Sequence, residues 1–206
     1  LDKNLDTIND AGQVSNIENN VTAFKTSFES YLKNIDLKKN EHKTEEFLQL
    51  QPFGKVPAMT YGERKLFESR SILRYIAKNN IEFEDFLGDT EVDVWLEAES
   101  QNFNPLASKI VYEKVFKKMW NKESDEKVVE ECVKELEKVL YIYEKRLENV
   151  PYIAGESYSI ADISHIPYSN HLLRCGFKDL FKSRPNVYKW IKRIMKREAV
   201  ENVLRH

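Results

Sequence analysis

Residues 51–70 read QPFGKVPAMTYGERKLFESR, and this stretch decides the fold of the first half of the chain. Residues 56–60 and 65–68 are short strand-like runs with Gly62 in the turn between them, a pattern that predicts a β-hairpin. Residues 69–78 follow at once and place apolar side chains at the spacing of one helix face, so they predict a helix. The order strand, strand, helix is typical of the end of a small α/β domain.

The residues before this stretch predict further short elements of the same domain. Residues 15–28 indicate a helix, because apolar side chains recur at helical spacing and Ser15 begins a capping box. Residues 31–37 place apolar side chains on one face in the manner of a strand. Residues 44–50 indicate a short helix, and we expect a first strand within residues 7–11.

The chain changes character near residue 80. Residues 79–89 break the pattern of short elements and form the predicted linker. Beyond them, long apolar stripes at helical spacing dominate. We therefore expect an α+β fold, in which a small α/β domain over residues 1–79 is followed by an all-α helical domain over residues 90–206.

The helices of the second domain have recognisable starts and interruptions. Residues 92–110 and 129–147 carry apolar stripes and predict long helices, with Pro105 bending or interrupting the first. Ser159 and Asp162 stand three residues apart, as a helix cap and the third helical residue do, so we expect another helix to begin there. His165, one turn further on, is expected to pack inside this domain.

The composition excludes several classes of function. The 206 residues contain 32 Lys+Arg and 34 Asp+Glu, a formal net charge of -2, which argues against broad attraction to nucleic acid or an anionic membrane. No apolar run is long enough to cross a bilayer, and the polar first ten residues lack a signal-peptide core. Cys132 and Cys175 make neither a disulfide framework nor a zinc motif. We expect a cytoplasmic protein with no metal, nucleic acid or membrane partner.

Several segments, in this order along the chain, resemble the glutathione transferase family. They read EHK (41–43), QPFGKVPA (51–58), KLFESR (65–70), WLEAES (95–100) and SIADISH (159–165). The first and fourth are similar to the phi class of that family, which is known from plants. The resemblance implies the cytosolic glutathione transferase fold, with a thioredoxin-like domain before the helical one. It also implies glutathione as co-substrate and assembly as a homodimer.

The resemblance assigns one group of residues to glutathione, a tripeptide with two carboxylates, one ammonium and a thiol. Val56 precedes Pro57, the position of the family's cis-proline, and offers its backbone to the glutathione cysteine as a strand would. Ser69 and its N–H hold the glutamyl carboxylate, because free amides at a helix N-terminus bind anions. Glu68 takes the ammonium.

A second group is assigned to the other end of the tripeptide. His42 and Lys43 match the family positions that hold the glycyl carboxylate, and Lys55 belongs to the same glutathione-binding set. The alternative interpretation gives these residues no ligand: Glu68 and Ser69 merely cap a helix, and Lys43 is a solvated surface charge.

Ser15 matches the family's catalytic serine, which donates a hydrogen bond to the glutathione sulfur. Lowering a thiol pKa of about 8.5 by two units takes roughly 2.7 kcal/mol. A hydrogen bond to a charged sulfur supplies about 1.5–3 kcal/mol and a helix N-terminus about 0.3–1 kcal/mol, which together suffice. The sequence departs from the family at Asn19 and Asn20, where a basic pair is usual, and Glu18 opposes a nearby thiolate. The alternative is that Ser15 is a plain helix cap.

The acceptor site is implied between the domains, lined by the start of the helical one. The apolar candidates are Phe103, Ile110, Phe116, Met119 and Trp120, although residues at helical spacing also form cores. The implied activity is that of a detoxification enzyme, a glutathione transferase that conjugates the glutathione thiolate to apolar electrophiles. The alternatives are a carrier of flavonoid-type or other apolar ligands with little or no catalysis, and a family member used in a biosynthetic pathway.

Overall fold

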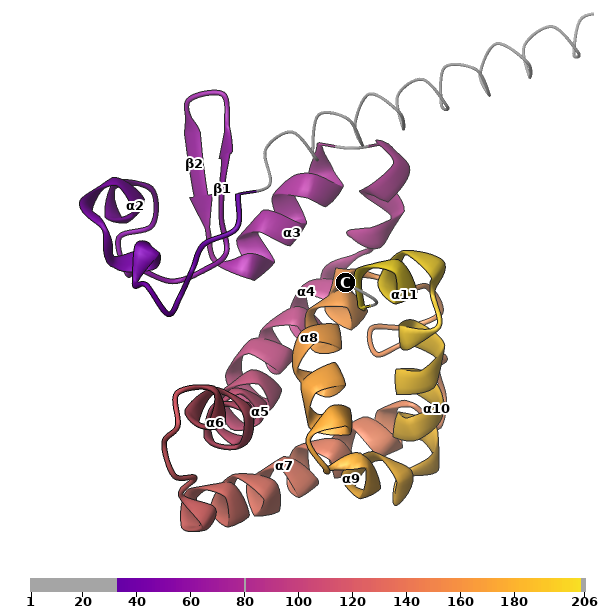
Figure 1. Ribbon diagram of the computed structural model, residues 1–206. Coiled ribbons are helices and arrows are strands. Elements are labelled where there is room, and N and C mark those ends of the chain that lie inside the picture. The colour runs from indigo at the N-terminus through magenta and orange to yellow at the C-terminus, as the bar shows by residue number, and fades with distance from the viewer. Residues whose placement is uncertain (1–32, 80, 205–206) are drawn as a thin grey trace, which may run out of the picture. The chain divides into compact units, whose positions relative to one another are not determined.

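The computed structural model describes residues 33–79 and 81–204, and Figure 1 traces them from indigo to yellow. The first strand predicted within residues 7–11 and the helix predicted over residues 15–28 lie outside the described residues. The same holds for Ser15.

The described residues fall into two compact units, one that ends at Val56 and one that begins at Pro57. The domains expected from the sequence, residues 1–79 and 90–206, stay a prediction. Among the helices of the described residues, none is long and apolar enough to cross a membrane.

The first unit contains a 3-10 turn, η1 (Glu41–Lys43), and a short helix, α2 (Glu45–Leu50). The helix begins after Thr44, whose hydroxyl accepts a hydrogen bond from the backbone N–H of Phe47 at 3.3 Å. Such a cap satisfies one of the amides that a helix start leaves unpaired. The short helix predicted over residues 44–50 is confirmed.

The strand predicted over residues 31–37 is wrong in its described part, because residues 33–37 contain no strand. The reason is local. The carboxylate of Asp36 accepts hydrogen bonds from the backbone N–H groups of Lys38 and Lys39, at 2.9 and 3.2 Å. An aspartate that bonds its own neighbouring backbone favours a turn over a strand.

The second unit begins with the predicted hairpin and helix. Strand β1 (Ala58–Tyr61) pairs antiparallel with β2 (Arg64–Phe67), and helix α3 (Ser69–Lys78) follows directly. Gly62, in the tight turn, has a φ of +58°, a conformation that glycine adopts without steric cost. Both predictions, the hairpin and the helix over residues 69–78, are confirmed.

The rest of the described chain is helical. Its elements are η2 (Ile81–Phe86), α4 (Thr90–Ala98), η3 (Glu99–Phe103), α5 (Asn104–Val111), η4 (Tyr112–Phe116), α6 (Lys117–Met119), α7 (Glu126–Arg146), α8 (Ile160–Arg174), α9 (Lys178–Lys182), α10 (Pro185–Met195) and α11 (Glu198–Leu204). The segment predicted as the linker therefore contains a 3-10 helix, and helices were correctly expected beyond it.

Helices α4 and α5 are joined by η3, a turn of π-helix, where the sequence predicted a bend or interruption at Pro105. A proline has no N–H to donate and crowds the carbonyl four residues earlier. The wider π-turn moves the preceding carbonyls out of the regular register, so helical structure continues through the proline. A second π-turn, η4, follows α5. Turns of this kind occur often at functional sites.

The core of the second unit lies where α5, α7, α8 and α10 pack against one another. The largest fully buried side chains include Phe103, Leu136, Leu140, Phe181 and Trp190. The apolar stripe predicted over residues 129–147 thus faces the core, as an amphipathic helix requires.

His165 packs inside this core, which confirms its prediction. The ring is fully buried; Nδ1 donates to the carbonyl of Ala161 at 2.7 Å, and Nε2 accepts from the hydroxyl of Tyr143 at 3.0 Å. Burial lowers the pKa of His165 to about 3, so the ring is neutral at physiological pH.

Candidate functional site

In the first unit, η1 is tied to the loop that leads to Val56. The ammonium of Lys43 donates to the carbonyls of Phe53 and Gly54, at 3.3 and 2.8 Å. Gly54 has a φ of +57°, and a Cβ on it would lie 2.8 Å from the carbonyl oxygen of His42. Only glycine fits there, so the structure brings the two residues predicted for the glycyl carboxylate, His42 and Lys43, against this loop.

The same loop is held from inside by Gln51, which is 1% exposed. Its side-chain oxygen accepts from the backbone N–H groups of Phe53 and Lys55, at 2.7 and 3.3 Å. Val56 follows with 44% of its surface exposed. Its backbone N–H and C=O take part in none of the hydrogen bonds within the described residues. A free backbone edge of this kind can pair with an extended peptide.

In the second unit, the start of α3 carries a strained residue. Glu68 has φ +67° and ψ 114°, a conformation that costs a residue with a side chain about 1–3 kcal/mol. Such strain persists only where the surroundings impose it, and it clusters at ligand sites. No side chain of the described chain caps the first turn of α3. The backbone N–H groups of this turn, which begins at Ser69, can therefore bind an anion.

The first turn of α3 is anchored by a residue that sequence analysis missed. The guanidinium of Arg70, next to Ser69, donates through Nε to Oε2 of Glu99 in η3 at 2.6 Å, and Nη2 contacts the same oxygen. Glu99 is fully buried, and burial raises its pKa to about 7 against the opposing effect of Arg70. The two residues stand 29 positions apart, and no local pattern links them.

The five predicted acceptor residues divide into two groups. Phe103 and Ile110 are 1% and 0% exposed and belong to the core, so they do not reach a surface ligand. Phe116 is half-buried, and Met119 and Trp120 are 52% and 38% exposed. Phe116 and Trp120 stack with ring centroids 6.1 Å apart. The structure therefore keeps three of the five together as candidates.

Two further rings extend this surface, and sequence analysis did not include them. Tyr112, 41% exposed, meets Trp120 edge-on at 6.0 Å, and His171 of α8 lies 6.3 Å from the ring of Phe116. We call Tyr112, Phe116, Met119 and Trp120 the aromatic patch. Partial burial, with a smaller effect of the Arg174 charge, lowers the pKa of His171. The helical spacing of Tyr112 and Phe116 was the one available signal for Tyr112.

The aromatic patch is fixed to the start of α7 by ion pairs. Lys114 pairs with Glu126 at 2.5 Å and Lys117 with Glu113 at 2.7 Å. Glu113 also accepts from the backbone N–H of Asp125 at 2.7 Å. These contacts tie η4 to the start of α7 and engage the carboxylates of Glu113 and Glu126.

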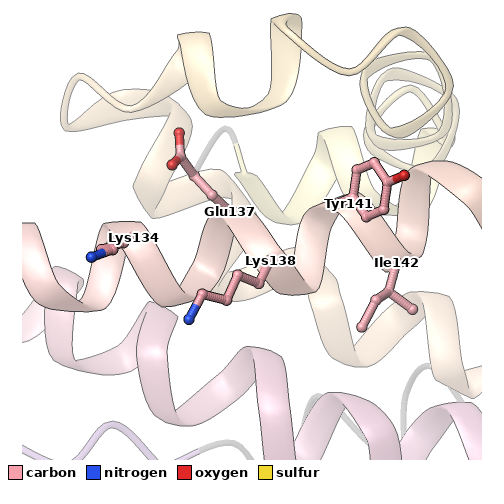
Figure 2. Close-up of a pocket in the computed structure, with 5 residues that line it drawn as sticks. All are labelled: Lys134, Glu137, Lys138, Tyr141 and Ile142. Carbon is pink, nitrogen blue, oxygen red and sulfur yellow. The ribbon is translucent and has the colours of Figure 1, made fainter.

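Helix α7 carries a hollow on its outer face that contains no predicted site residue. The hollow, of about 500 Å³, is lined by Lys134, Glu137, Lys138, Tyr141 and Ile142. Figure 2 shows that all five side chains come from that one helix, and none is a predicted site residue. Among the described residues, no group of three or more His, Cys, Asp or Glu side chains is placed to hold a metal ion.

Comparison with known proteins shows which family this chain is similar to. The family model described as the N-terminal domain of glutathione S-transferase matches residues 15–78, and that of the C-terminal domain matches residues 103–198. A glutathione S-transferase of Hyoscyamus muticus is 41% identical over 171 residues, which cover 80% of this chain and 81% of that protein. Glutathione S-transferase F4 of Arabidopsis thaliana is 40% identical over 172 residues, covering 80% and 70%.

A solved structure is similar over the same part of the chain. Glutathione S-transferase I from maize, in complex with an atrazine glutathione conjugate, superposes with a TM-score of 0.76 at 34% identity. The match covers 83% of this chain and 82% of that one.

Proposed function

Because this chain belongs to the phi class of the glutathione S-transferase family and has that family's fold, a thioredoxin-like domain followed by a helical one, we propose that it transfers glutathione to apolar electrophiles. The observation that carries the proposal is the start of α3, where strained Glu68 precedes a helix that no described side chain caps. The uncapped amides can bind the carboxylate of a γ-glutamyl group, and the carboxylate of Glu68 can pair with its ammonium. Glu68 and Ser69 belong to the segment KLFESR (65–70), which resembles the family motif.

Glutathione then lies with its glutamyl carboxylate at Ser69 and its ammonium at Glu68. Its cysteine pairs with the backbone of Val56 beside Pro57, a mode in which main-chain hydrogen bonds supply affinity. The glycyl carboxylate is bound by His42 and Lys43, with Lys55 nearby. The buried pair of Arg70 and Glu99 supports this arrangement, because it fixes the turn that carries Ser69.

The transfer itself is a nucleophilic displacement or addition. The serine at position 15 donates to the glutathione sulfur and keeps it a thiolate, which attacks the electrophilic atom of the acceptor. With chlorodinitrobenzene as acceptor, the sulfur–carbon bond forms, the carbon–chlorine bond breaks and chloride leaves. The aromatic patch offers stacked and edge-on rings, which suit a planar apolar acceptor. We further propose that the protein works in the cytosol as a homodimer.

The first test is binding. Millimolar glutathione is expected to raise the melting temperature, because a ligand that binds the native state stabilises it by mass action. Ser69→Ala removes a hydrogen bond to a charged group and is expected to weaken glutathione binding about 10- to 100-fold. Ser71→Ala, an exposed serine of the same helix, is the matched control and should leave the affinity unchanged. If glutathione gives no shift in wild type, the proposal fails.

The second test separates an enzyme from a carrier. Conjugation of chlorodinitrobenzene is measured for wild type and Ser15→Ala at saturating glutathione. Loss of activity with glutathione binding retained supports the transferase. If wild type is inactive but still binds an apolar dye, and Trp120→Ala weakens that dye binding, the carrier is favoured.

A further inference from the structure

A second hollow, of about 230 Å³, lies where the ends of α8, α9 and α10 meet. Its apolar lining is Leu173 of α8 and Tyr188, Ile191 and Met195 of α10. The α10 residues follow the spacing i, i+3 and i+7, so they share one helix face. Ile191 is 1% exposed and the other three are half-buried, which makes an apolar floor with a partly open top.

The rim of this hollow is basic. Arg174 at the end of α8, Lys178 at the start of α9 and Lys192 of α10 line it, and all three are exposed. In the described part of the chain, none of them has an ion-pair partner, and no carboxylate lines the hollow. The nearest acidic residue in sequence, Asp179, is 93% exposed and pairs with Lys182 at 3.8 Å.

One of the three cations, Lys192, lies over an aromatic ring of the apolar floor. The ammonium of Lys192 lies 5.6 Å from the ring centroid of Tyr188, in cation–π range. The positive charge of Arg174 acts on His171, one helical turn earlier in α8, where it helps to lower the pKa of that ring. The rim therefore carries uncompensated positive charge beside buried hydrocarbon.

We propose that this hollow binds a small amphipathic anion, a carboxylate on a short hydrocarbon body. The unpaired cations supply charge complementarity for the carboxylate, and Leu173, Ile191 and Met195 bury the hydrocarbon. At about 30 Å³ for each water of the liquid, the hollow has room for roughly eight waters, or a chain of about that many carbons. The site contains none of the residues proposed for glutathione or the acceptor, and the inference does not rest on the transferase activity.

The methionines allow a direct test, since the chain contains 3 of them. Met195 lines the hollow, Met119 lies in the aromatic patch and Met59 lies in β1, close in sequence to Val56. Protein labelled with ¹³C in the methionine methyls is titrated with octanoate, 1-octanol and octylammonium, which share one hydrocarbon chain and differ in head group. We expect octanoate to shift the Met195 methyl saturably, 1-octanol to act more weakly, and octylammonium to have no effect.

Charge variants complete the test. Arg174→Gln, Lys178→Gln and Lys192→Gln are each expected to weaken octanoate binding about two- to fivefold, as befits exposed charges. Lys189→Gln, an exposed lysine of α10 outside the hollow, is the matched control and should change nothing. Raising sodium chloride to about 0.5 M should weaken octanoate binding and spare that of 1-octanol.

The inference is overturned if octanoate shifts Met119 in place of Met195, because the ligand then occupies the aromatic patch. It is overturned equally if octanoate and 1-octanol bind alike, or if Lys189→Gln weakens binding as much as the rim variants. Conjugation activity is measured in parallel on the same variants, so a failure of the transferase proposal is scored separately.

Discussion

Asp162 in α8 and Glu99 in η3 are both fully buried carboxylates of the second unit, yet their surroundings differ. Oδ1 of Asp162 accepts from the backbone N–H of Ile153 at 3.0 Å and from the indole N–H of Trp190 at 2.7 Å. Oδ2 accepts from the backbone N–H and the hydroxyl of Ser159, at 2.9 and 3.3 Å. Each oxygen is thus satisfied, which a buried carboxylate requires.

Glu99 is satisfied on one side only. Its Oε2 is held by Arg70, and its Oε1 has no hydrogen-bond partner in the described part of the chain. Burial raises the pKa of both carboxyls, and that of Glu99 reaches about 7. Asp162 joins residues that only build the helical core, whereas Glu99 reaches the turn of α3 that carries Ser69. One carboxylate therefore serves the fold, and the other connects the fold to the proposed glutathione site.

The largest effect is expected at Asp162. Asp162→Ala leaves the N–H groups of Ile153, Ser159 and Trp190 buried without an acceptor, and we expect a loss of about 4 kcal/mol in the free energy of unfolding. Urea unfolding followed by tryptophan fluorescence measures it. Asp179→Ala, at an exposed aspartate, is the control and should unfold like wild type. A loss below about 1 kcal/mol for Asp162→Ala would remove the contrast between the two carboxylates.

The next effect is a pH dependence at Glu99. Its folded pKa, about 7, lies above its ordinary value of 4.5, so between these values the folded protein holds a proton that the unfolded chain releases. Stability from this group is therefore full below about pH 4.5 and declines as pH rises to 7, by roughly 3 kcal/mol in all.

Glu99→Gln cannot titrate and removes this decline. Relative to wild type, the variant is expected to gain stability steadily as unfolding is measured at pH values from about 5 to 7.5. Glu135→Gln is the control, because Glu135 is exposed on α7 and pairs with Lys138 at 2.7 Å. A difference between Glu99→Gln and wild type that stays constant with pH would show that Glu99 is ionised throughout.

His165 acts in the opposite direction over the same pH range. Its pKa is lowered from 6.5 to about 3, so below pH 6.5 the unfolded chain takes up a proton that the folded protein refuses. Stability from this group falls on acidification, by about 2 kcal/mol between pH 6.5 and 5. In wild type this loss offsets the gain from Glu99.

His165→Asn is expected to uncover that gain, so that stability rises on acidification from about pH 6.5 to 5. His171→Asn gives a graded comparison, because the pKa of His171 is lowered by partial burial and a smaller slope change should follow. The slope with pH is read from urea unfolding at each pH, which separates titration from any constant loss of packing. An unchanged slope in His165→Asn contradicts a neutral buried ring.

The contrast between the carboxylates also explains what the sequence could predict. The contact between Ser159 and Asp162 spans three residues and was predicted from a capping pattern, as were the hairpin and α3 from local turn and helix signals. The pair of Arg70 and Glu99 spans 29 residues, and periodicity along one helix says nothing about which other helix meets it.

The same distinction applies to the errors. The strand expected over residues 31–37 failed in its described part because one aspartate, Asp36, bonds the adjacent backbone, a competition that apolar alternation does not register. Phe103 and Phe116 were both predicted from apolar residues at helical spacing, but the π-turn over residues 112–116 changes the register between them. Phe103 is fully buried in the core, whereas Phe116 is only partly buried against it. Spacing alone could not separate them.

The smallest effect tests whether Glu99 reaches the site through Arg70. Arg70→Lys keeps the charge but replaces a planar fork that contacts Glu99 through two nitrogens with a single ammonium. Looser support of the α3 turn is expected to weaken glutathione binding about threefold, or about 0.65 kcal/mol. Arg74→Lys is the matched control, since Arg74 anchors the same helix to Asp93 and Glu97 at 2.9 and 3.1 Å, away from its first turn. A coupling from Glu99 to Ser69 must make a substitution in the first turn of α3 weaken binding more than one in the second. If calorimetric titration finds the same affinity for glutathione in Arg70→Lys as in Arg74→Lys, the pair of Arg70 and Glu99 stabilises only the fold, as Asp162 does.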